Sequence, residues 1–213
     1  MSRRQGTRDA LIAAGLPLFG GSYSDAVGID DILQAAGVSK QTFYNHFTDK
    51  AALLKAIHAS IRVEYRQHAD RVNLSEIDSA RRMARALCAH ASLAMQDPGR
   101  GRFISRTLLD DLGTTSELNC GIVDEVSLGL AQGRLSGLTL ESGVCYTMGV
   151  TQALIALLLT SEEPARAIET VQRFAMLLLR GFGVGQPEAE LIAGEAAREI
   201  IGRADIYATA PKA

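Results

Sequence analysis

The segment 39–47 carries side chains whose types and spacing suit contact with DNA. Gln41 and Asn45 are four residues apart, so on a helix they share one face, and Phe43 and Phe47 share the opposite face. Side-chain amides can bond the edges of adenine bases in the major groove. The sequence therefore predicts a helix with an apolar inner face and an outer face that reads base edges.

Other polar side chains around this segment suit the sugar–phosphate backbone. Lys40, His46 and Lys50 lie at the sides of the predicted helix, where the phosphates of a bound duplex would pass. Thr42 can pack on a thymine methyl group, and Tyr44 flanks the amide face. The predicted DNA-binding residues are Ser39, Lys40, Gln41, Thr42, Tyr44, Asn45, His46 and Lys50.

Two short helices joined by a tight turn must position these side chains. Apolar residues at helical spacing predict a helix over about 28–35. Gly37 supplies the turn because glycine tolerates positive φ, and Ser39 is a good N-cap for a helix over about 39–47. With a first helix that ends at Gly20-Gly21-Ser22, these elements form a helix-turn-helix unit.

The run from Ala36 to Phe47, followed by Lys50 and Leu53, resembles the signature of TetR-type repressors, A-G-V-S-x-x-T-[LF]-Y-x-[HY]-F-x-x-K-x-x-L. The resemblance covers about residues 8–55. It implies a homodimer with two N-terminal DNA-binding heads, and a helical C-terminal domain that binds a small molecule and releases the DNA. It places Lys40 to His46 on the recognition helix and Lys50 against a phosphate.

Three features depart from that family pattern. Val27 and Gly28 stand where the family often has Thr or Ser, so a hydroxyl contact to phosphate before the second helix is missing. Gly15 and Pro17 weaken the first helix by their low helix propensity. The acidic pair Asp30-Asp31 lies near the expected DNA face, although the family often has an acidic residue at the second of these positions.

The rest of the chain keeps a helical apolar period. We predict further helices at about 76–97, 101–112, 116–133, 139–161, 164–183 and 187–203, with no alternating pattern typical of strands. The fold class is therefore all-α. We expect a three-helix helix-turn-helix domain over residues 1–55 and a larger helical domain for ligand binding and dimerisation over residues 56–213.

Two adjacent C-terminal helices suit a dimer interface. The segment 144–159 is apolar on nearly every face, and apolar residues in 164–183 recur in heptad steps of three and four. A four-helix interface would pair these helices with their copies, and an ordinary core within one chain is the alternative. The interface residues that we predict are Ile155, Leu158, Val171, Leu178 and Phe182.

A small-molecule site is expected among the C-terminal helices. Met83, Met95 and Met148 are flexible side chains that suit an adaptable apolar pocket. Gln152 is a polar residue within an apolar helix and could orient a ligand. The alternative is that the methionines are core residues and that Gln152 points outward.

Composition limits the class of protein. The chain has 213 residues and a formal net charge of -2, so DNA contact must come from a local patch rather than from bulk charge. Three widely spaced cysteines (Cys88, Cys120 and Cys145) argue against a disulfide framework, and we expect each to be buried, with a thiol sensor as the alternative. The longest apolar stretch is too short for a membrane span, which needs roughly 20 residues, and no signal peptide is recognised. We therefore expect a cytoplasmic protein.

The sequence contains none of the common catalytic or metal-binding motifs. It lacks H-E-x-x-H, G-x-S-x-G and Cys/His metal spacing, so we predict no catalytic residue, metal or cofactor. The expected function is a transcriptional regulator that binds double-stranded operator DNA, a repressor released by a small-molecule effector. The alternatives are a helical enzyme or carrier with a vestigial DNA-binding motif, and a DNA-binding activator or architectural protein without a ligand.

Overall fold

The computed structural model describes residues 3–21, 27–161 and 163–202, and within these ranges the regular elements are all helical. The predicted all-α fold class is confirmed. The α-helices are α1 (Arg3–Gly21), α2 (Ile29–Ala36), α3 (Lys40–Tyr44), α4 (Lys50–Val72), α5 (Ser79–Gln96), α6 (Pro98–Thr107), α7 (Cys120–Ala131), α8 (Leu140–Thr160), α9 (Ala167–Gly181) and α10 (Gln186–Ile200). Short 3-10 turns occur at Leu108–Asp110, Glu117–Asn119 and Pro164–Arg166.

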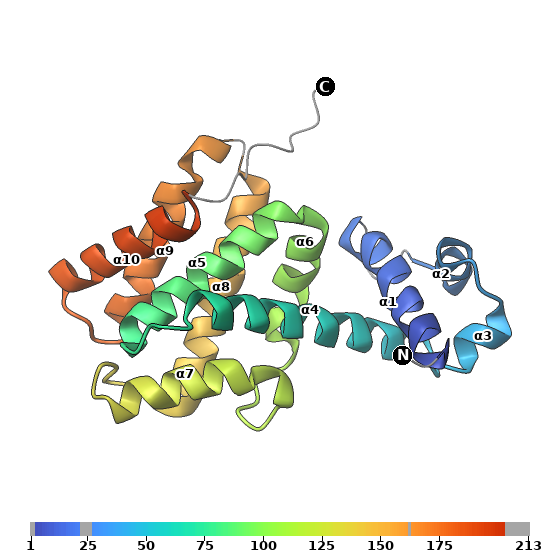
Figure 1. The fold of residues 1–213 in the computed structure, drawn as a ribbon, viewed down its shortest axis with the longest axis horizontal. Coiled ribbons are helices and arrows are strands. Elements are labelled where there is room, and N and C mark those ends of the chain that lie inside the picture. The colour runs from blue at the N-terminus through green and yellow to red at the C-terminus, as the bar shows by residue number, and fades with distance from the viewer. Residues whose placement is uncertain (1–2, 22–26, 162, 203–213) are drawn as a thin grey trace.

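The helices form a small lobe and a larger lobe joined by α4. Helices α1 to α3 lie at one end of the molecule, and α5 to α10 form the larger lobe (Figure 1). Helix α4 starts beside α3 and runs without a break into the larger lobe. The boundary that we predict between residues 55 and 56 therefore lies inside a continuous helix, which mechanically connects the two lobes.

Helix α1 contains both residues expected to weaken it. Pro17 lies inside α1 without ending it. Gly15 faces α4 so closely that a Cβ atom there would lie 2.9 Å from Ile57 Cδ1. Glycine at this position therefore serves the packing of α1 on α4, and tertiary contact outweighs its low helix propensity.

Two helix ends differ from the prediction for local reasons. Helix α3 ends at Tyr44 instead of reaching residue 47, because the chain tightens there: His46 N–H donates to the Phe43 carbonyl at 2.9 Å. Helix α6 begins at Pro98, earlier than the predicted start at about residue 101. Asp97 caps this end by accepting from Arg100 N at 3.1 Å, and proline is well suited to the first helical turn.

Helix α5 lies at the centre of the larger lobe and packs against α4, α8, α9 and α10. Its buried side includes Leu87 and Cys88, which are almost completely shielded from solvent. Among the described helices, α8 alone has the length and apolar composition of a membrane span. It packs in the structure against α5, α6, α7 and α9, so much of its apolar surface belongs to the core.

The five predicted interface residues lie in the core of a single chain. Ile155, Val171 and Leu178 have no exposed surface, Phe182 is 1% exposed, and Leu158 packs partly buried against the same core. Four of the five therefore offer almost no free surface to a second chain, and Leu158 offers only part of its side chain. Heptad spacing identified the buried stripe correctly, but the stripe is covered by neighbouring helices of the same chain.

Candidate nucleic-acid interface and internal cavity

The turn between α2 and α3 has the backbone geometry that the sequence predicts. Gly37 has φ of 63°, in the left-handed region that favours glycine. The N–H groups of Val38 and Gly37 donate to the carbonyls of Leu33 and Gln34 at 3.2 and 3.3 Å. This pair of bonds is a Schellman motif, which ends α2 and fixes the direction in which α3 leaves.

The start of α2 is held by two charged residues. Asp31 Oδ2 accepts from Gly28 N–H at 2.8 Å, so this carboxylate caps its own helix. Lys50 Nζ, from the first turn of α4, donates to the Val27 carbonyl at 3.0 Å. An acidic side chain near the DNA face is thus explained by local structure, and Lys50 ties the beginning of α2 to α4.

The start of α3 uses Ser39 and Thr42 together. Ser39 Oγ accepts from Thr42 N–H at 3.2 Å and lies 2.9 Å from Thr42 Oγ1. Ser39 is therefore the N-cap that its sequence position predicts. Thr42 is half-buried and its hydroxyl is engaged at this cap, while its methyl group is the part left for other contacts.

The outer face of α3 presents the predicted polar side chains together. Lys40, Gln41, Tyr44 and Asn45 are exposed, and Gln41 Nε2 donates to Asn45 Oδ1 at 3.3 Å. On the opposite side Phe43 has no exposed surface. It packs on Phe47, with ring centroids 5.9 Å apart. The inner and outer faces of the helix are therefore divided as the sequence indicates.

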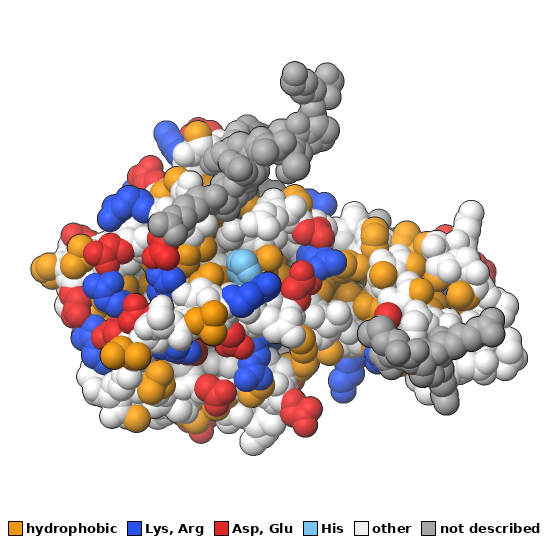
Figure 2. Space-filling view, viewed as in Figure 1, with side chains coloured by type: hydrophobic (Ala, Val, Ile, Leu, Met, Phe, Trp, Pro, Cys, Tyr) orange, Lys and Arg blue, Asp and Glu red, His pale blue; other side chains and the backbone are white. Residues whose placement is uncertain are grey.

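The two remaining predicted DNA-binding residues, His46 and Lys50, are half-buried at the edge of this face. On the side of the molecule drawn in Figure 2, positive and negative side chains are interspersed over the larger lobe, and the small lobe shows mostly uncharged surface. On this side of the molecule, therefore, no broad basic surface is offered to DNA.

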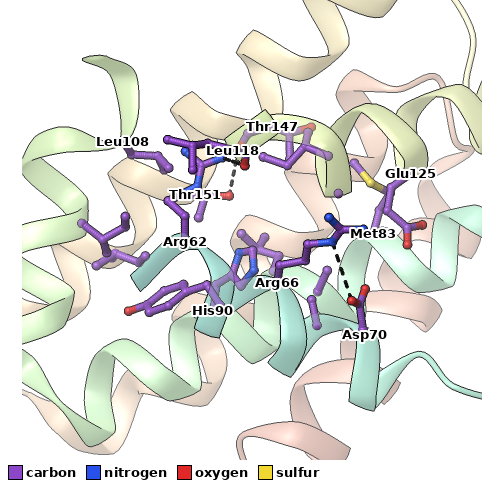
Figure 3. A pocket seen from close by; sticks show the side chains of 18 residues that line it. Arg62, Arg66, Asp70, Met83, His90, Leu108, Leu118, Glu125, Thr147 and Thr151 are labelled. Atoms are coloured by element: carbon purple, nitrogen blue, oxygen red, sulfur yellow. Dashed lines mark hydrogen bonds and ion pairs between the residues drawn. The ribbon is translucent and has the colours of Figure 1, made fainter. Parts of the chain in front are cut away.

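The larger lobe contains a partly open cavity of about 80 Å³. Its walls come from α4, α5, α6, α7 and α8, and apolar side chains dominate them (Figure 3). The residues that matter most for its chemistry are Arg62, Tyr65, Met83, His90, Ile104 and Leu108. A small, mostly apolar cavity with a few polar groups is the usual form of a small-molecule site.

One of the four predicted effector residues lines this cavity. Met83 is part of the wall. Met148 is fully buried elsewhere in the core, and Met95 packs partly buried against that core. Gln152 points neither outward nor into the cavity, because its Nε2 donates to the Ser105 carbonyl at 2.6 Å and links α8 to α6.

Sequence reasoning missed the two most distinctive polar groups of the cavity wall. Arg62 is only 8% exposed, and its Nη2 donates to the Leu118 carbonyl and to Asn119 Oδ1 at 2.8 and 2.6 Å. Arg62 Nη1 and His90 Nε2 are buried without a hydrogen-bond partner among the described residues. Burial also lowers the pKa of His90 to about 4. Helical spacing carried a signal for Arg62, because His58, Arg62 and Tyr65 recur beside the apolar stripe of α4.

Two helices of the cavity wall also contact the small lobe. Helix α4 supplies Arg62 to the cavity and Lys50 to the start of α2. Helix α6 supplies Ile104 to the cavity, and two residues earlier Arg102 Nε donates to the Gly20 carbonyl of α1 at 3.0 Å. A change in the cavity can therefore reach the small lobe through two packed helices.

The three cysteines have different environments. Cys88 is buried, and burial raises the pKa of its thiol to about 12. Cys120 is half-buried and accepts a bond from Arg66, and Cys145 is exposed, so the expectation that every cysteine is buried is wrong for these two. Within the described residues no group of three His, Cys, Asp or Glu side chains is arranged to hold a metal ion.

Comparison with known proteins agrees with this geometry. A family model described as bacterial regulatory proteins, tetR family, matches residues 11–57, which contain most of α1, all of α2 and α3, and the start of α4. No curated protein sequence matches the chain. The matched residues include the turn at Gly37 and the exposed face of α3.

Solved structures extend the likeness over most of the chain. The RolR structure in complex with resorcinol is 25% identical, with a TM-score of 0.65 over 90% of this chain and 94% of that one. A tetR family transcription regulator from Shewanella sp. PV-4 is 18% identical, with a TM-score of 0.68 over 82% and 96%. A gamma-butyrolactone receptor is 19% identical, with a TM-score of 0.57 over 93% and 100%. The last two likenesses concern the fold alone. The matched helix-turn-helix and the shared architecture show a DNA-binding transcription regulator, in which residues 11–57 match the tetR family and the fold resembles that of solved tetR family regulators.

Proposed function

We propose that this regulator is a repressor that leaves its operator when a small molecule enters the cavity of the larger lobe. The observation that carries the proposal is that α4 and α6 each contribute to the cavity wall and each contact the small lobe. RolR, which has a similar fold, was solved with resorcinol bound. The cavity has a volume of about 80 Å³, about half of the roughly 150 Å³ that holds benzene, so a ligand of that size must move the walls as it enters.

The release step would act through the positions of α4 and α6. A ligand that prefers one arrangement of the cavity walls shifts the population toward that arrangement. Because Lys50 and Arg102 bond the backbone at Val27 and Gly20, a shift of either helix moves α2 or α1. Two DNA-binding heads that fit adjacent half-sites without the ligand would then no longer fit those half-sites when the ligand is bound.

We further propose that the protein works as a homodimer on double-stranded DNA in the cytoplasm. The short helix α3 spans too few base pairs to specify a site by itself, so paired heads would read a near-palindrome with half-sites about 34–36 Å apart or somewhat more. An outer face of α8 and α9 suits the contact between copies. This α8–α9 outer face consists of Tyr146, Ala153, Leu157, Phe174 and Leu177.

Several observations support this α8–α9 outer face as the dimer contact. Leu157 and Leu177 are 47% and 49% exposed, which is unusual for leucines on neighbouring helices. Tyr146 joins the helices, because its hydroxyl donates to the Leu177 carbonyl at 2.9 Å. We therefore place the dimer contact on the pair of helices that the heptad pattern indicates, on their exposed side.

The proposal is tested by selecting DNA fragments with the purified protein, sequencing them, and titrating the recovered site. We expect a near-palindromic site that is bound in preference to scrambled DNA. We also expect a small-molecule extract of the source cells to release it. Failure to select any sequence would contradict the DNA-binding role, and a complex that no extract or ligand weakens would contradict the effector-controlled repressor.

A further inference from the structure

Arg62 is a buried cation in the cavity wall without an ion-pair partner among the described residues. Among the described residues, no carboxylate lies within salt-bridge distance of Arg62. By contrast, Arg66 on the same wall has Asp70 at 3.8 Å, and Arg82 is paired with Glu125. The nearest acidic influence is Asp111, which bonds Ser116 and the Gly113 backbone instead. A guanidinium held in this way retains much of its desolvation cost, which an anion in the cavity would offset.

The second unpartnered group, His90, is an acceptor. Burial, together with the nearby positive charge of Arg62, lowers the pKa of His90 to about 4, so the ring is neutral at pH 7. The ring also bonds the backbone of Tyr65, which leaves Nε2, the atom without a partner, as the acceptor. A ligand that satisfies this wall must therefore bring a hydrogen-bond donor to His90 as well as an anionic oxygen to Arg62.

The size and the remaining walls of the cavity restrict the body of the ligand. A volume of about 80 Å³ is about half that of a cavity of roughly 150 Å³ that holds benzene, so even a single ring must displace the walls or extend through the opening of the pocket. Leu87, Ile104 and Leu108 are apolar parts of the lining. The rings of Tyr65 and His90 also lie in the wall, with centroids 5.3 Å apart. These neighbours favour a single aromatic ring, and a fused ring system or a long acyl chain would require a much larger displacement of the walls.

We propose that the effector is a single-ring aromatic acid with a hydroxyl group, bound with its carboxylate on Arg62 and its hydroxyl on His90 (Figure 3). This inference rests on the proposed function, in which the cavity is the effector site. Arg62 Nη1 donates to the carboxylate, and the ligand hydroxyl donates to His90 Nε2. Arg62 Nη1 and His90 Nε2 are then both satisfied, and Tyr65 Oη is a further unpartnered atom of a wall residue.

A matched ligand series tests the charge requirement on the full-length protein. We would measure binding of 3-hydroxybenzoate, benzoate and 3-hydroxybenzamide by calorimetry, with resorcinol as a neutral diphenol. We expect 3-hydroxybenzoate to bind more tightly than 3-hydroxybenzamide by about tenfold or more, because only the acid brings a charge to Arg62. We expect benzoate to bind more weakly than 3-hydroxybenzoate, because it has no donor for His90.

Variants assign these preferences to individual residues. Arg62→Met keeps much of the side-chain volume and should abolish the preference for acid over amide, and Arg62→Lys should retain part of it. Arg66→Met is the matched control, because Arg66 lines the same cavity but is paired with Asp70. This control should keep the wild-type preference. His90→Leu should remove the advantage of 3-hydroxybenzoate over benzoate while leaving the preference for an acid.

The result that overturns the inference is equal or tighter binding of the neutral ligands, or an acid preference that survives in Arg62→Met. If Arg62→Met does not fold, the wild-type ligand series and Arg62→Lys still decide. If the protein selects an operator and releases it with a cell extract but binds none of the aromatic acids, the ligand class is wrong and the repressor proposal stands. If no operator is selected, the proposed function itself fails.

Discussion

Gln41 and Asn45 are exposed side by side on α3, and Gln41 Nε2 donates to Asn45 Oδ1, so the two amides form one polar surface. Lys50 lies at the edge of this surface and already donates to the Val27 carbonyl. We therefore expect the two kinds of residue to contribute differently, with Gln41 specifying the sequence and Lys50 positioning the head.

Gln41→Ala should reduce the preference for operator over scrambled DNA by about 1–3 kcal/mol if the amide makes a bidentate base contact. Lys50→Ala should weaken binding to both DNAs alike and lower the salt dependence by about one phosphate contact. Titrations of both DNAs at several salt concentrations measure this. The assignment fails if Lys50→Ala changes sequence preference and Gln41→Ala does not. In that case Thr42, whose methyl group remains available, becomes the better candidate for a base contact.

The buried His90 ring should make stability depend on pH below neutrality. Its pKa is about 4 in the folded chain, whereas a solvated histidine, as in the unfolded chain, has its ordinary pKa of 6.5. The unfolded chain therefore takes up the proton first, and stability is lost as the pH falls from about 6.5 to about 4. The loss from this residue is at most about 3 kcal/mol.

Urea unfolding of wild type and His90→Leu at pH 7 and pH 5 measures this effect. The variant should lose less stability than wild type between the two pH values. It should still lose some, because burial also lowers the pKa of His58 and His68. An equal loss in both proteins would show that His90 does not titrate differently on unfolding.

At the scale of helices, the backbones of α1 and α6 approach each other closely at Gly20, where the small lobe meets the larger lobe. A Cβ atom on Gly20 would lie 2.6 Å from the Gly99 carbonyl oxygen, and Arg102 bonds the Gly20 carbonyl from the same helix α6. Because the neighbouring atoms belong to the backbone, they cannot move aside as a flexible side chain would. The absence of a side chain at Gly20 therefore sets how α1 rests on α6.

Gly20→Ala should force α1 away from α6, destabilise the protein by about 1–3 kcal/mol, and change the effector concentration needed to release DNA. Gly21→Ala is the control, because a Cβ atom there meets nothing within 4 Å. Thermal unfolding and operator release by the effector are the measurements. Equal behaviour of the two variants would mean that the α1–α6 contact carries neither stability nor the response.

For the whole molecule, the exposed leucines of the α8–α9 outer face provide the test of assembly. A double substitution, Leu157→Lys with Leu177→Lys, should convert the dimer to a folded monomer, because both side chains are about half exposed in a single chain. Leu191→Lys on α10 is the control, since Leu191 is 54% exposed outside that face. Sedimentation velocity at micromolar concentration distinguishes the two forms.

The monomer should also lose most of its operator affinity, since a single head reads only one half-site. Circular dichroism shows whether the double variant keeps its helices. A wild-type protein that sediments as a stable monomer would remove the basis for paired heads. A control variant that also dissociates would place the contact elsewhere.

The local structure of the small lobe could be predicted from the sequence alone. Its signals act over a few residues: the left-handed glycine at Gly37, the Ser39 cap and the aromatic pair Phe43 and Phe47. Helical periodicity predicted the remaining helices for the same reason, with errors at the ends of α3 and α6. Those ends depend on local hydrogen bonds, and the cap at Asp97 allows α6 to begin at Pro98.

Packing between distant segments determines which polar and apolar residues face a cavity, a neighbouring helix or solvent. Periodicity marks Val171 and Leu178 as buried but cannot say that helices of the same chain bury them. It cannot show that Gln152 bonds the Ser105 carbonyl. It also cannot show that Arg62 and His90, far apart in sequence, line one wall with Nη1 and Nε2 lacking a partner among the described residues. These properties required the folded structure, because a pattern within one helix carries no information about its neighbour.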